Sequence, residues 1–330
     1  MRRGAPWLLV VLAALALVLL LSVGVGARPI PLGRVWSLVW RPDGSSDAAI
    51  VHDLRIPRTL LGLMVGAALG VAGALMQALT RNPLADPGLL GVNAGAAAAV
   101  VTATTLLGTV DPLAYIWFAF LGAAVASVVV YGIGTAGRSG ATPVRLALAG
   151  TAVSIALIAY VEGLTIVDRE ALDQYRFWAV GALGGHPGSL NAQIAPFILA
   201  GLVLAVALGR PLNAIGLGED SGRALGARLV RTRVLGAVAI TVLCGAATAA
   251  VGPIAFVGLA VPHVARAITG PDERLVLPLS AAIAPVMLLG ADVVGRVVNR
   301  PGELEVGIVS ALAGAPVFIA IVRRRRIAQL

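Results

Sequence analysis

Long apolar runs, separated by short polar segments, make up most of the chain. A helix needs about 20 predominantly apolar residues to cross the hydrocarbon core of a bilayer. Nine runs are long enough or nearly so, and they cover about 5–27, 57–80, 88–107, 112–135, 145–167, 192–209, 231–251, 275–295 and 304–322. A tenth run, about 254–269, is shorter and carries His263 and Arg266 near its end. The pattern predicts nine or ten membrane-spanning helices.

Composition agrees with a membrane protein. Of the 330 residues, 58% are hydrophobic and 12% are charged, whereas a water-soluble fold would need polar positions at helix or strand period within such runs. With roughly 20 residues per crossing plus connections, the length allows about eight to ten helices and no separate soluble domain. We therefore expect an all-α, polytopic membrane protein with a single transmembrane domain over residues 1–330.

Arginine placement predicts the orientation, because cytoplasmic loops carry an excess of basic residues. If the chain starts inside and crosses ten times, sixteen of its 25 basic residues, all arginines, fall on the starting side and nine on the other. Nine crossings would put the four closing arginines, 323–326, outside. The count favours ten helices in the cytoplasmic (inner) membrane with both termini cytoplasmic. The run at about 5–27 exceeds the apolar core of a secretory signal, which favours a retained first helix.

The residue inventory excludes several kinds of chemistry. The chain contains no lysine, so it lacks the lysine of a Walker A phosphate loop and any lysine for a Schiff base. The single cysteine, Cys244, cannot form an internal disulfide, and His52, His186 and His263 lack metal-ligand spacing. We expect no cofactor or metal on this chain, and no partnership with nucleic acid.

One polar segment interrupts the apolar pattern just past the middle of the chain. It reads GLGEDSGRALGARLVRTR and covers residues 216–233. Glu219 and Asp220 precede Arg223, which is the charge order that a helix dipole favours, and Gly226 can cap the helix before the next apolar run. We expect a short helix at the cytoplasmic surface. Either it is a solvated loop that anchors the membrane helix, or it docks a partner.

This segment resembles the cytoplasmic coupling segment of the FecCD permease family, whose ATP-driven importers take up ferric siderophores, haem and vitamin B12. Three further stretches resemble the same family: RIPRTLLGLMVGAALGVAGALMQALTRNPLADPGLLGVNAG (55–95), VGPIAFVGLAVPHVARAITGPDERLVLPLSA (251–281) and ADVVGRVVNRPGELEVGIVSALAGAPVF (291–318). Together these stretches cover more than a third of the chain.

The resemblance implies a ten-helix permease with the fold of type II importers of the ATP-binding-cassette (ABC) class. Such a subunit works by alternating access beside a second permease copy, either identical or a paralogue. Two separate ATPase subunits would bind ATP and Mg beneath it, and an extracytoplasmic binding protein would deliver cargo from above. The implied function is import of a ferric siderophore. Haem and cobalamin remain alternatives, because the sequence does not identify the cargo.

The resemblance also implies which residues couple and gate transport. The coupling segment, about 212–229, would transmit the action of the ATPase through Gly218, Glu219, Asp220, Arg223, Leu225 and Gly226. Asn82 and Leu84 lie in the turn RNPLADPG, and they would help to close the cytoplasmic gate together with Thr142. Without the resemblance, RNPLADPG predicts only a turn.

Three arginines are predicted to dock the binding protein. Arg55 and Arg58 share a helix face on the side that should be poor in arginine, and Arg296 ends a later helix on the same side. Interfacial snorkelling of long side chains is the alternative for each. The resemblance implies that they meet acidic residues of the binding protein. Glu305 and Glu162 depart from the family's pattern, and no role follows for them.

Small residues recur along the second run. Gly62, Gly66, Gly70 and Ala74 stand at every fourth position, and such a seam lets helices pack closely in lipid. The stretch YRFWAVGALGG, 175–185, is too short to cross and is expected to lie at the membrane interface. The resemblance implies a short helix that lines the external mouth.

Other classes of membrane protein fit the sequence less well. An ion-coupled secondary transporter needs carboxylates or broken helices near the midplane, whereas Glu162 and Asp292 lie near helix ends. Asp292 is expected to form an ion pair or a hydrogen bond beside Arg296. An intramembrane protease is disfavoured, because Glu219 stands where a Gly-x-Gly-Asp motif has its aspartate.

Overall fold

The computed structural model describes residues 5–108, 112–136, 143–218 and 228–323, which form helices joined by turns. Ten apolar helices follow the predicted runs: α1 (Ala5–Gly24), α4 (Ile56–Thr80), α5 (Val92–Leu107), α6 (Pro112–Thr135), α7 (Pro143–Val167), α9 (Ser189–Ala207), α12 (Leu229–Val251), α13 (Val257–Thr269), α14 (Glu273–Val298) and α15 (Val306–Arg323). The other elements are short: α2 (Leu32–Trp40), α3 (Ser46–Ala49), the π-helical η1 (Ile50–Arg55), the 3-10 helix η2 (Pro87–Leu90), α8 (Arg169–Val180) and α10 (Gly209–Gly216).

The ten apolar helices fall into two classes of length. Among the described residues, seven helices are long and apolar enough to span a bilayer, and Val92–Leu107, Val257–Thr269 and Val306–Pro316 are shorter apolar helices. Because the tenth run is short, hydropathy alone left the number of helices at nine or ten. In the structure this run forms a separate helix, α13. The prediction of an all-α polytopic protein with ten apolar helices is confirmed.

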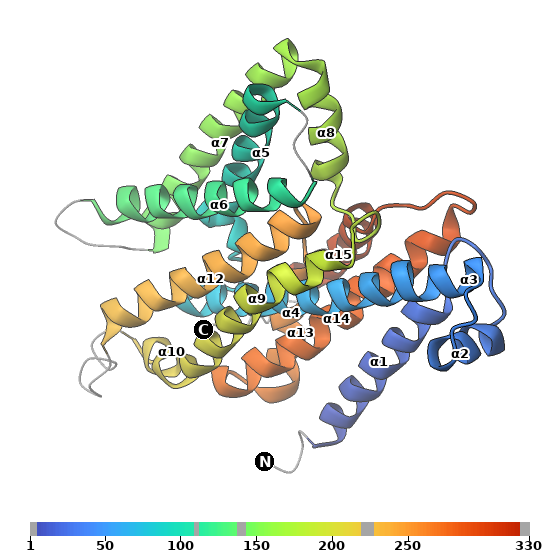
Figure 1. Ribbon diagram of the computed structural model, residues 1–330. Helices are drawn as coiled ribbons and strands as arrows, with labels where there is room; N and C mark the ends of the chain where they lie inside the picture. Colours follow the sequence, from blue (N-terminus) through green and yellow to red (C-terminus); the bar gives the residue numbers. More distant parts are fainter. Residues whose placement is uncertain (1–4, 109–111, 137–142, 219–227, 324–330) are drawn as a thin grey trace.

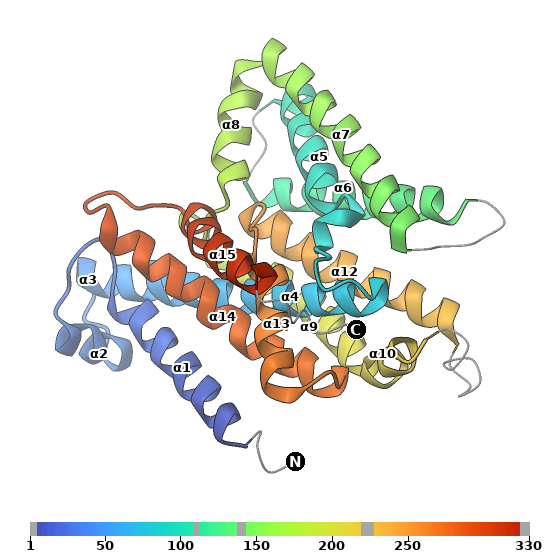
Figure 2. The same cartoon turned by 180° about the vertical axis from the view of Figure 1, so that it is seen from behind.

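Helix α4 lies at the centre of the fold. It packs against α14, α12, α13 and α9, and α1 lies against α14 on the outside. Helices α5, α6, α7 and α8 form a second group that stands above this layer, with α6 lying along α12 (Figure 1). The same division is visible from behind (Figure 2). The second group is thus joined to the α4 layer largely through α12.

The small-residue seam of α4 makes its central position possible. A Cβ atom at Gly66 would lie 2.7 Å from the Cα atom of Pro285, and one at Gly70 would lie 2.7 Å from the carbonyl oxygen of Ser280. Gly62 faces the side chain of Leu289. Because these neighbours lie on α14, the glycines let the two helix backbones approach closely. The predicted packing seam is confirmed.

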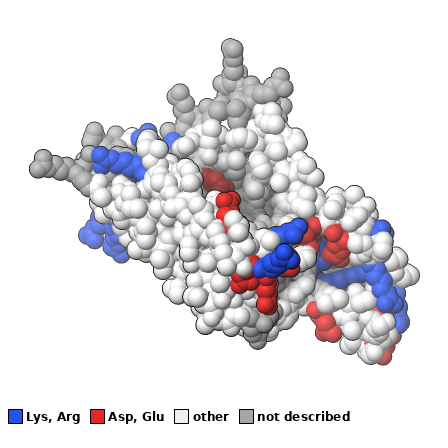
Figure 3. All heavy atoms as spheres, turned by 90° about the horizontal axis from the view of Figure 1, so that it is seen from above, with Lys and Arg blue, Asp and Glu red and all other residues white. Residues whose placement is uncertain are grey.

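Charged side chains gather at the two ends of the helix bundle. We call these the α10 end, formed by α10, the start of α12 and the end of α4, and the α2 end, formed by α2, α3 and the start of α4. Figure 3 shows basic side chains toward the α10 end on the left and mixed acidic and basic side chains from the middle of the view to the α2 end on the right, with a largely uncharged surface between these two groups. This distribution is expected of a protein whose middle lies in lipid.

Two helical segments begin earlier than the sequence predicts. Helix α4 begins at Ile56, close to the predicted start, but α3 and η1 precede it without a break, so that the helical segment covers Ser46–Thr80. Proline is accepted in the first turn of α4, where its missing N–H has no intrahelical partner. The predicted stretch 175–185 is only partly helical: α8 begins earlier, where Asp168 accepts hydrogen bonds from two backbone N–H groups, and it ends before Gly181, whose φ is +78°.

We expect Gly73→Ala to destabilise the protein. A Cβ atom at Gly73 would lie 1.8 Å from the carbonyl oxygen of Gly258, and overpacking of this kind typically costs about 1–3 kcal/mol. Gly163→Ala is the matched control, because a Cβ atom at that position of α7 would meet nothing within 4 Å. The measurement is the thermal unfolding midpoint in detergent. Equal midpoints for the two variants would show that α4 and α13 are not in close contact.

Candidate functional site

A buried cluster of charges lies at the α2 end, where α1, α4 and α14 meet. One oxygen of Asp292, Oδ1, accepts hydrogen bonds from Nη2 of Arg58 at 2.6 Å and from Nε at 3.2 Å. The other oxygen, Oδ2, accepts from Nη2 of Arg296 at 2.6 Å. Arg58 also pairs with Glu303 at 2.6 Å. We call Arg58, Asp292, Arg296 and Glu303 the α2-end cluster.

The cluster is largely shielded from solvent. Relative exposure is 0% for Asp292 and 1% for Arg296, and the Arg58 side chain is 12% exposed. Arg296 donates further to the backbone oxygens of Ser22 and Val25, at 2.8 and 3.0 Å, and to the Ser22 hydroxyl at 2.9 Å. Buried charges are tolerated when they are paired and hydrogen-bonded in this way. The expected ion pair between Asp292 and Arg296 is confirmed.

Arg55 has a separate structural role at the same end. Its guanidinium donates to the carbonyl oxygens of Val23, Gly24 and Arg28, at 3.1, 2.9 and 2.7 Å. Two of these carbonyls belong to the last turn of α1, where a cation is favoured by the helix dipole and satisfies otherwise unpaired acceptors. Arg55 is 4% exposed, so it fastens α1 to the start of α4.

These contacts change the prediction for the three docking arginines. Arg55 and Arg296 are buried, which contradicts the exposed surface that direct ion pairs with a binding protein would require. Arg58 is the one of the three that reaches a partly exposed partner, because the Glu303 side chain is 32% exposed. The prediction that all three lie at one end of the bundle is confirmed. The sequence could not give the rotation of each helix, which turns Arg296 toward Asp292.

Glu305 lies next to the cluster and was noted only as a departure from the family's pattern. Burial raises the pKa of its carboxyl group, while the nearby Arg58 guanidinium acts in the opposite direction. Its neighbour Glu303, which the sequence analysis missed, is the one that pairs directly with Arg58. The only available signal was its position in the polar turn that follows α14. Glu162 is exposed on α7.

A second polar cluster lies at the α10 end, and the sequence analysis missed most of it. Arg266 of α13 donates to Gln77 of α4 at 2.5 Å and to Glu273 of α14 at 3.1 Å. Asn213 of α10 donates to Asp272 at 2.7 Å and accepts from the backbone N–H of Glu273 at 2.8 Å. The side-chain bond to Asn213 is the largest cause of a lowered pKa at Asp272. These contacts tie α10 to the start of α14, which Arg266 connects in turn to α13 and α4.

The predicted gate turn lies beside this cluster. Asn82 accepts a hydrogen bond from the backbone N–H of Leu84 at 2.9 Å, and Asp86 accepts one from Gly88 at 2.8 Å. A ring nitrogen of His263 lies 2.8 Å from the carbonyl oxygen of Pro83, which fastens the turn to α13. Leu84 itself is 41% exposed. The predicted turn is confirmed, whereas Thr142 lies outside the described residues.

Of the predicted coupling segment, about 212–229, the structure describes residues 212–218 and 228–229. Helix α10 buries Leu212 and Ile215, and Gly218 follows with φ of +103°, a conformation that favours glycine. The remaining predicted coupling residues, Glu219, Asp220, Arg223, Leu225 and Gly226, lie outside the described residues. The predicted surface helix is therefore not tested over 219–227.

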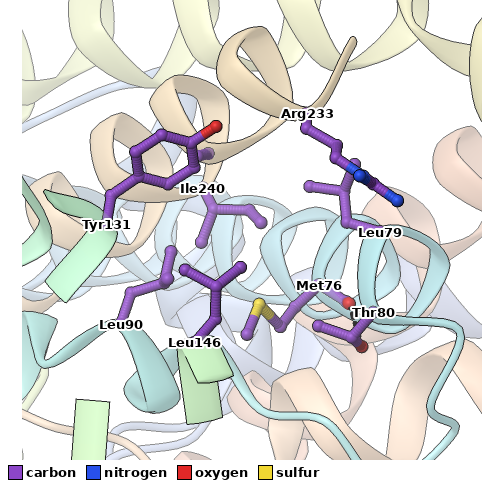
Figure 4. Close-up of a pocket in the computed structure, with 9 residues that line it drawn as sticks. Met76, Leu79, Thr80, Leu90, Tyr131, Leu146, Arg233 and Ile240 are labelled. Carbon is purple, nitrogen blue, oxygen red and sulfur yellow. Dashed lines mark hydrogen bonds between the residues drawn. The ribbon is translucent and has the colours of Figure 1, made fainter. Parts of the chain in front are cut away.

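A cavity near the α10 end lies between α4, η2, α6, α7 and α12 (Figure 4). It is lined by Met76, Leu79, Thr80, Leu90, Tyr131, Leu146, Arg233, Ala237 and Ile240. Arg233 is the only charged residue of this lining, and the Thr80 hydroxyl is already bonded to the Met76 carbonyl oxygen at 2.6 Å. The lining contains no carboxylate, thiol or imidazole for acid–base or nucleophilic chemistry. Among the described residues, no group of three or more His, Cys, Asp or Glu side chains could hold a metal ion.

Comparison with known proteins gives consistent matches over nearly the whole chain. The model of the FecCD transport family matches residues 14–324. The ferric enterobactin transport system permease protein FepD of Escherichia coli (strain K12) is 48% identical over 306 residues, which are 92% of this chain and 91% of FepD. The Fe(3+)-citrate import system permease protein YfmD of Bacillus subtilis (strain 168) is 40% identical over 98% of this chain and 97% of YfmD.

The fold also matches a solved structure, described as an inward-facing conformation of a metal-chelate type ABC transporter. The TM-score is 0.85 at 24% sequence identity, and the match covers 97% of this chain and 99% of the other. At this identity the comparison supports the fold of the chain.

We expect Asp292→Asn to destabilise the protein strongly. The substitution keeps the side-chain shape but leaves two buried guanidinium groups without their shared anion, and loss of one partner from a buried ion pair costs about 3–5 kcal/mol. The measurement is the thermal unfolding midpoint in detergent.

Asp43→Asn is the matched control, because Asp43 pairs with Arg34 on an exposed surface, and exposed ion pairs contribute little. Asp292→Glu retains the charge and should recover part of the loss. If Asp292→Asn unfolds at the wild-type temperature, the cluster does not hold the helices together.

Proposed function

This chain belongs to the FecCD transport family, and we propose that its cargo is a ferric siderophore. It is the permease subunit of an ABC importer and is not itself an ATPase. Its lack of lysine agrees with this, because a Walker A phosphate loop requires one. The observation that carries the cargo proposal is the 48% identity, over 92% of the chain, with a ferric enterobactin permease.

Ferric chelates are favoured over the other cargoes of the family. Both relatives described above are named for ferric complexes, one of enterobactin and one of citrate. Haem and cobalamin are the alternatives. The side chains of this chain do not decide among them, because the apolar helix surfaces offer few groups that would recognise a particular ligand.

We propose the following assembly and orientation. Two ATPase subunits contact the α10 end, a binding protein docks at the α2 end, and a second permease copy, either identical or a paralogue, lies beside the chain. The whole chain then forms one transmembrane domain, with the α10 end and both termini in the cytoplasm. This is supported by the arginine count, since sixteen of the 25 arginines fall on the proposed cytoplasmic side.

The coupling segment, about 212–229, would transmit the state of the ATPase to the membrane helices. What supports this is the contact between α10 and α14, where Asn213 bridges to both Asp272 and Glu273. A push on α10 would therefore reach the start of α14 directly. Alternating access requires that the partner favour different helix packings in its different nucleotide states.

Asn82, Leu84 and Thr142 are proposed to close the cytoplasmic gate. The exposure of Leu84, on a turn that His263 fastens to α13, supports a role at the mouth of the path. We propose that Arg58, together with its partner Glu303, contacts the binding protein. Arg55 and Arg296 would contribute indirectly, by holding α1 and α14 in place.

The main rival function, an ion-coupled secondary transporter, is disfavoured by the two buried carboxylates. Asp292 is paired with two arginines at one end of α14, and Glu273 is paired with Arg266 at the other end. An ion-coupling carboxylate would be expected near the bilayer midplane, where it is available to a proton or sodium ion. By relative exposure, Asp292 and Glu273 are the two carboxylates of the described residues that are buried, and both lie at ends of α14.

The cargo is tested by uptake of labelled compounds in a strain from which the gene for this chain has been deleted. We expect uptake of ferric enterobactin or another ferric siderophore to fall to background and to return when the gene is restored. Uptake of haem and cobalamin should not change. Loss of haem or cobalamin uptake with normal siderophore uptake would overturn the cargo proposal while leaving the permease assignment intact.

A variant in the coupling segment tests the connection to the ATPase. Replacing residues 219–225 by a Gly/Ser linker, or introducing Leu225→Asp, should abolish uptake and co-purification of the ATPase, while the chain still inserts. Leu32→Asp is the matched control for co-purification of the ATPase, which it should not change, because Leu32 is 56% exposed at the opposite, α2 end. Normal uptake in the linker variant would remove the segment from the mechanism.

A further inference from the structure

A groove runs along the outside of the bundle between α6 and α12. The two helices lie side by side in both views (Figures 1 and 2). The groove is lined by Phe120, Ala124, Ser127, Val128, Tyr131, Gly132, Val234, Ala237, Val238, Thr241 and Val242. This lining contains no charged residue, and several of its valines face outward: Val128 is 72% exposed and Val238 is 46% exposed.

Two arginines stand where the groove reaches the α10 end. A shallow hollow at the start of α12 includes Arg228 and Arg231 together with Val234, which also lines the groove. Both arginines are exposed and make no ion pair within the described part of the chain. The first turn of α12 contains no acidic residue, so among the described residues no carboxylate balances these charges at the positive end of the helix dipole. The hollow therefore favours an anion.

The groove is comparable in length with the hydrocarbon depth of one leaflet. From Val234 to Val242, the part of α12 that lines the groove, a helix rises about 12 Å, at 1.5 Å per residue. One leaflet of a hydrocarbon core of about 30 Å accounts for about 15 Å of depth. A phosphate held at Arg228 and Arg231 would thus place an acyl chain along the valines of the groove. Tyr131, with an apolar ring and a polar hydroxyl, lies near the same end, as expected of aromatic side chains at a membrane interface.

We propose that this groove binds an anionic phospholipid. Its phosphate lies between Arg228 and Arg231, and one acyl chain lies between α6 and α12. Clustered basic residues beside membrane helices attract anionic headgroups, and guanidinium groups bind phosphate through charge-assisted hydrogen bonds. The charged end and the apolar groove together select a lipid over a free phosphate, which would gain nothing from the groove. The proposal does not depend on the cargo.

The test measures retained lipid on the full chain. The protein is extracted from membranes of defined phosphatidylglycerol and phosphatidylcholine content, and its bound lipids are counted by native mass spectrometry. We expect wild type to retain phosphatidylglycerol preferentially. The Arg228→Gln/Arg231→Gln variant should bind it about tenfold more weakly, because two contacts to the phosphate are lost. Val238→Trp should reduce retention of both lipids by filling the groove.

Two matched controls separate this site from general effects. Arg210→Gln removes an exposed arginine of α10 at the same end of the bundle, and Val203→Trp adds bulk at an exposed position of α9 away from the groove. Both should retain lipid as wild type does. Equal retention by all variants, or equal loss in the controls, would overturn the proposal. The proposal would also be overturned if inorganic phosphate competed with the lipid as strongly in Val238→Trp as in wild type. Such a result would show that the arginines bind phosphate without any contribution from the groove.

Discussion

The carboxylate of Asp292 is the contact on which the helix arrangement at the α2 end depends. It is fully buried, and it binds one guanidinium from α4 and one from its own helix. In a low-dielectric interior each of these charges would be strongly unfavourable alone. Their mutual pairing therefore fixes the rotation and the register of α4 against α14. Arg296 extends the same constraint to α1, because it donates to the Ser22 backbone and hydroxyl.

Once that register is set, small residues bring the helices together along their length. Gly66 and Gly70 bring α4 against the backbone of α14. At the other end Gln77, Arg266 and Glu273 connect α4 to α13 and α14. Helix α4 is thus tied at both ends by charge-assisted bonds and packed closely between them. Helices α5 to α8 join this layer largely through α12 (Figure 2). Such a division suits transport by movement of packed helix groups against one another.

The residues also explain why the sequence indicates a permease but does not identify its cargo. A permease that leaves ATP chemistry to a partner needs no phosphate loop, and the absence of lysine agrees with that division of work. The cargo is different, because a path that releases a bulky ligand must not bind it tightly. Its walls are therefore expected to be apolar and to carry few groups that distinguish one ligand from another.

The sequence by itself determined nine of the apolar helices, their order and the ends at which the charges lie, because a bilayer dictates the length and hydropathy of each crossing; the arginine count was needed to favour a tenth. It also determined the glycine seam of α4 and the pairing of Asp292 with Arg296, since both follow from helical spacing. Only the tertiary structure decided that Arg296 and Arg55 turn inward, that Arg58 meets Glu303, and that Arg266 meets Gln77. Those contacts join residues far apart in the chain, and they depend on how each helix rotates and crosses its neighbours, which is set by packing and not by local sequence.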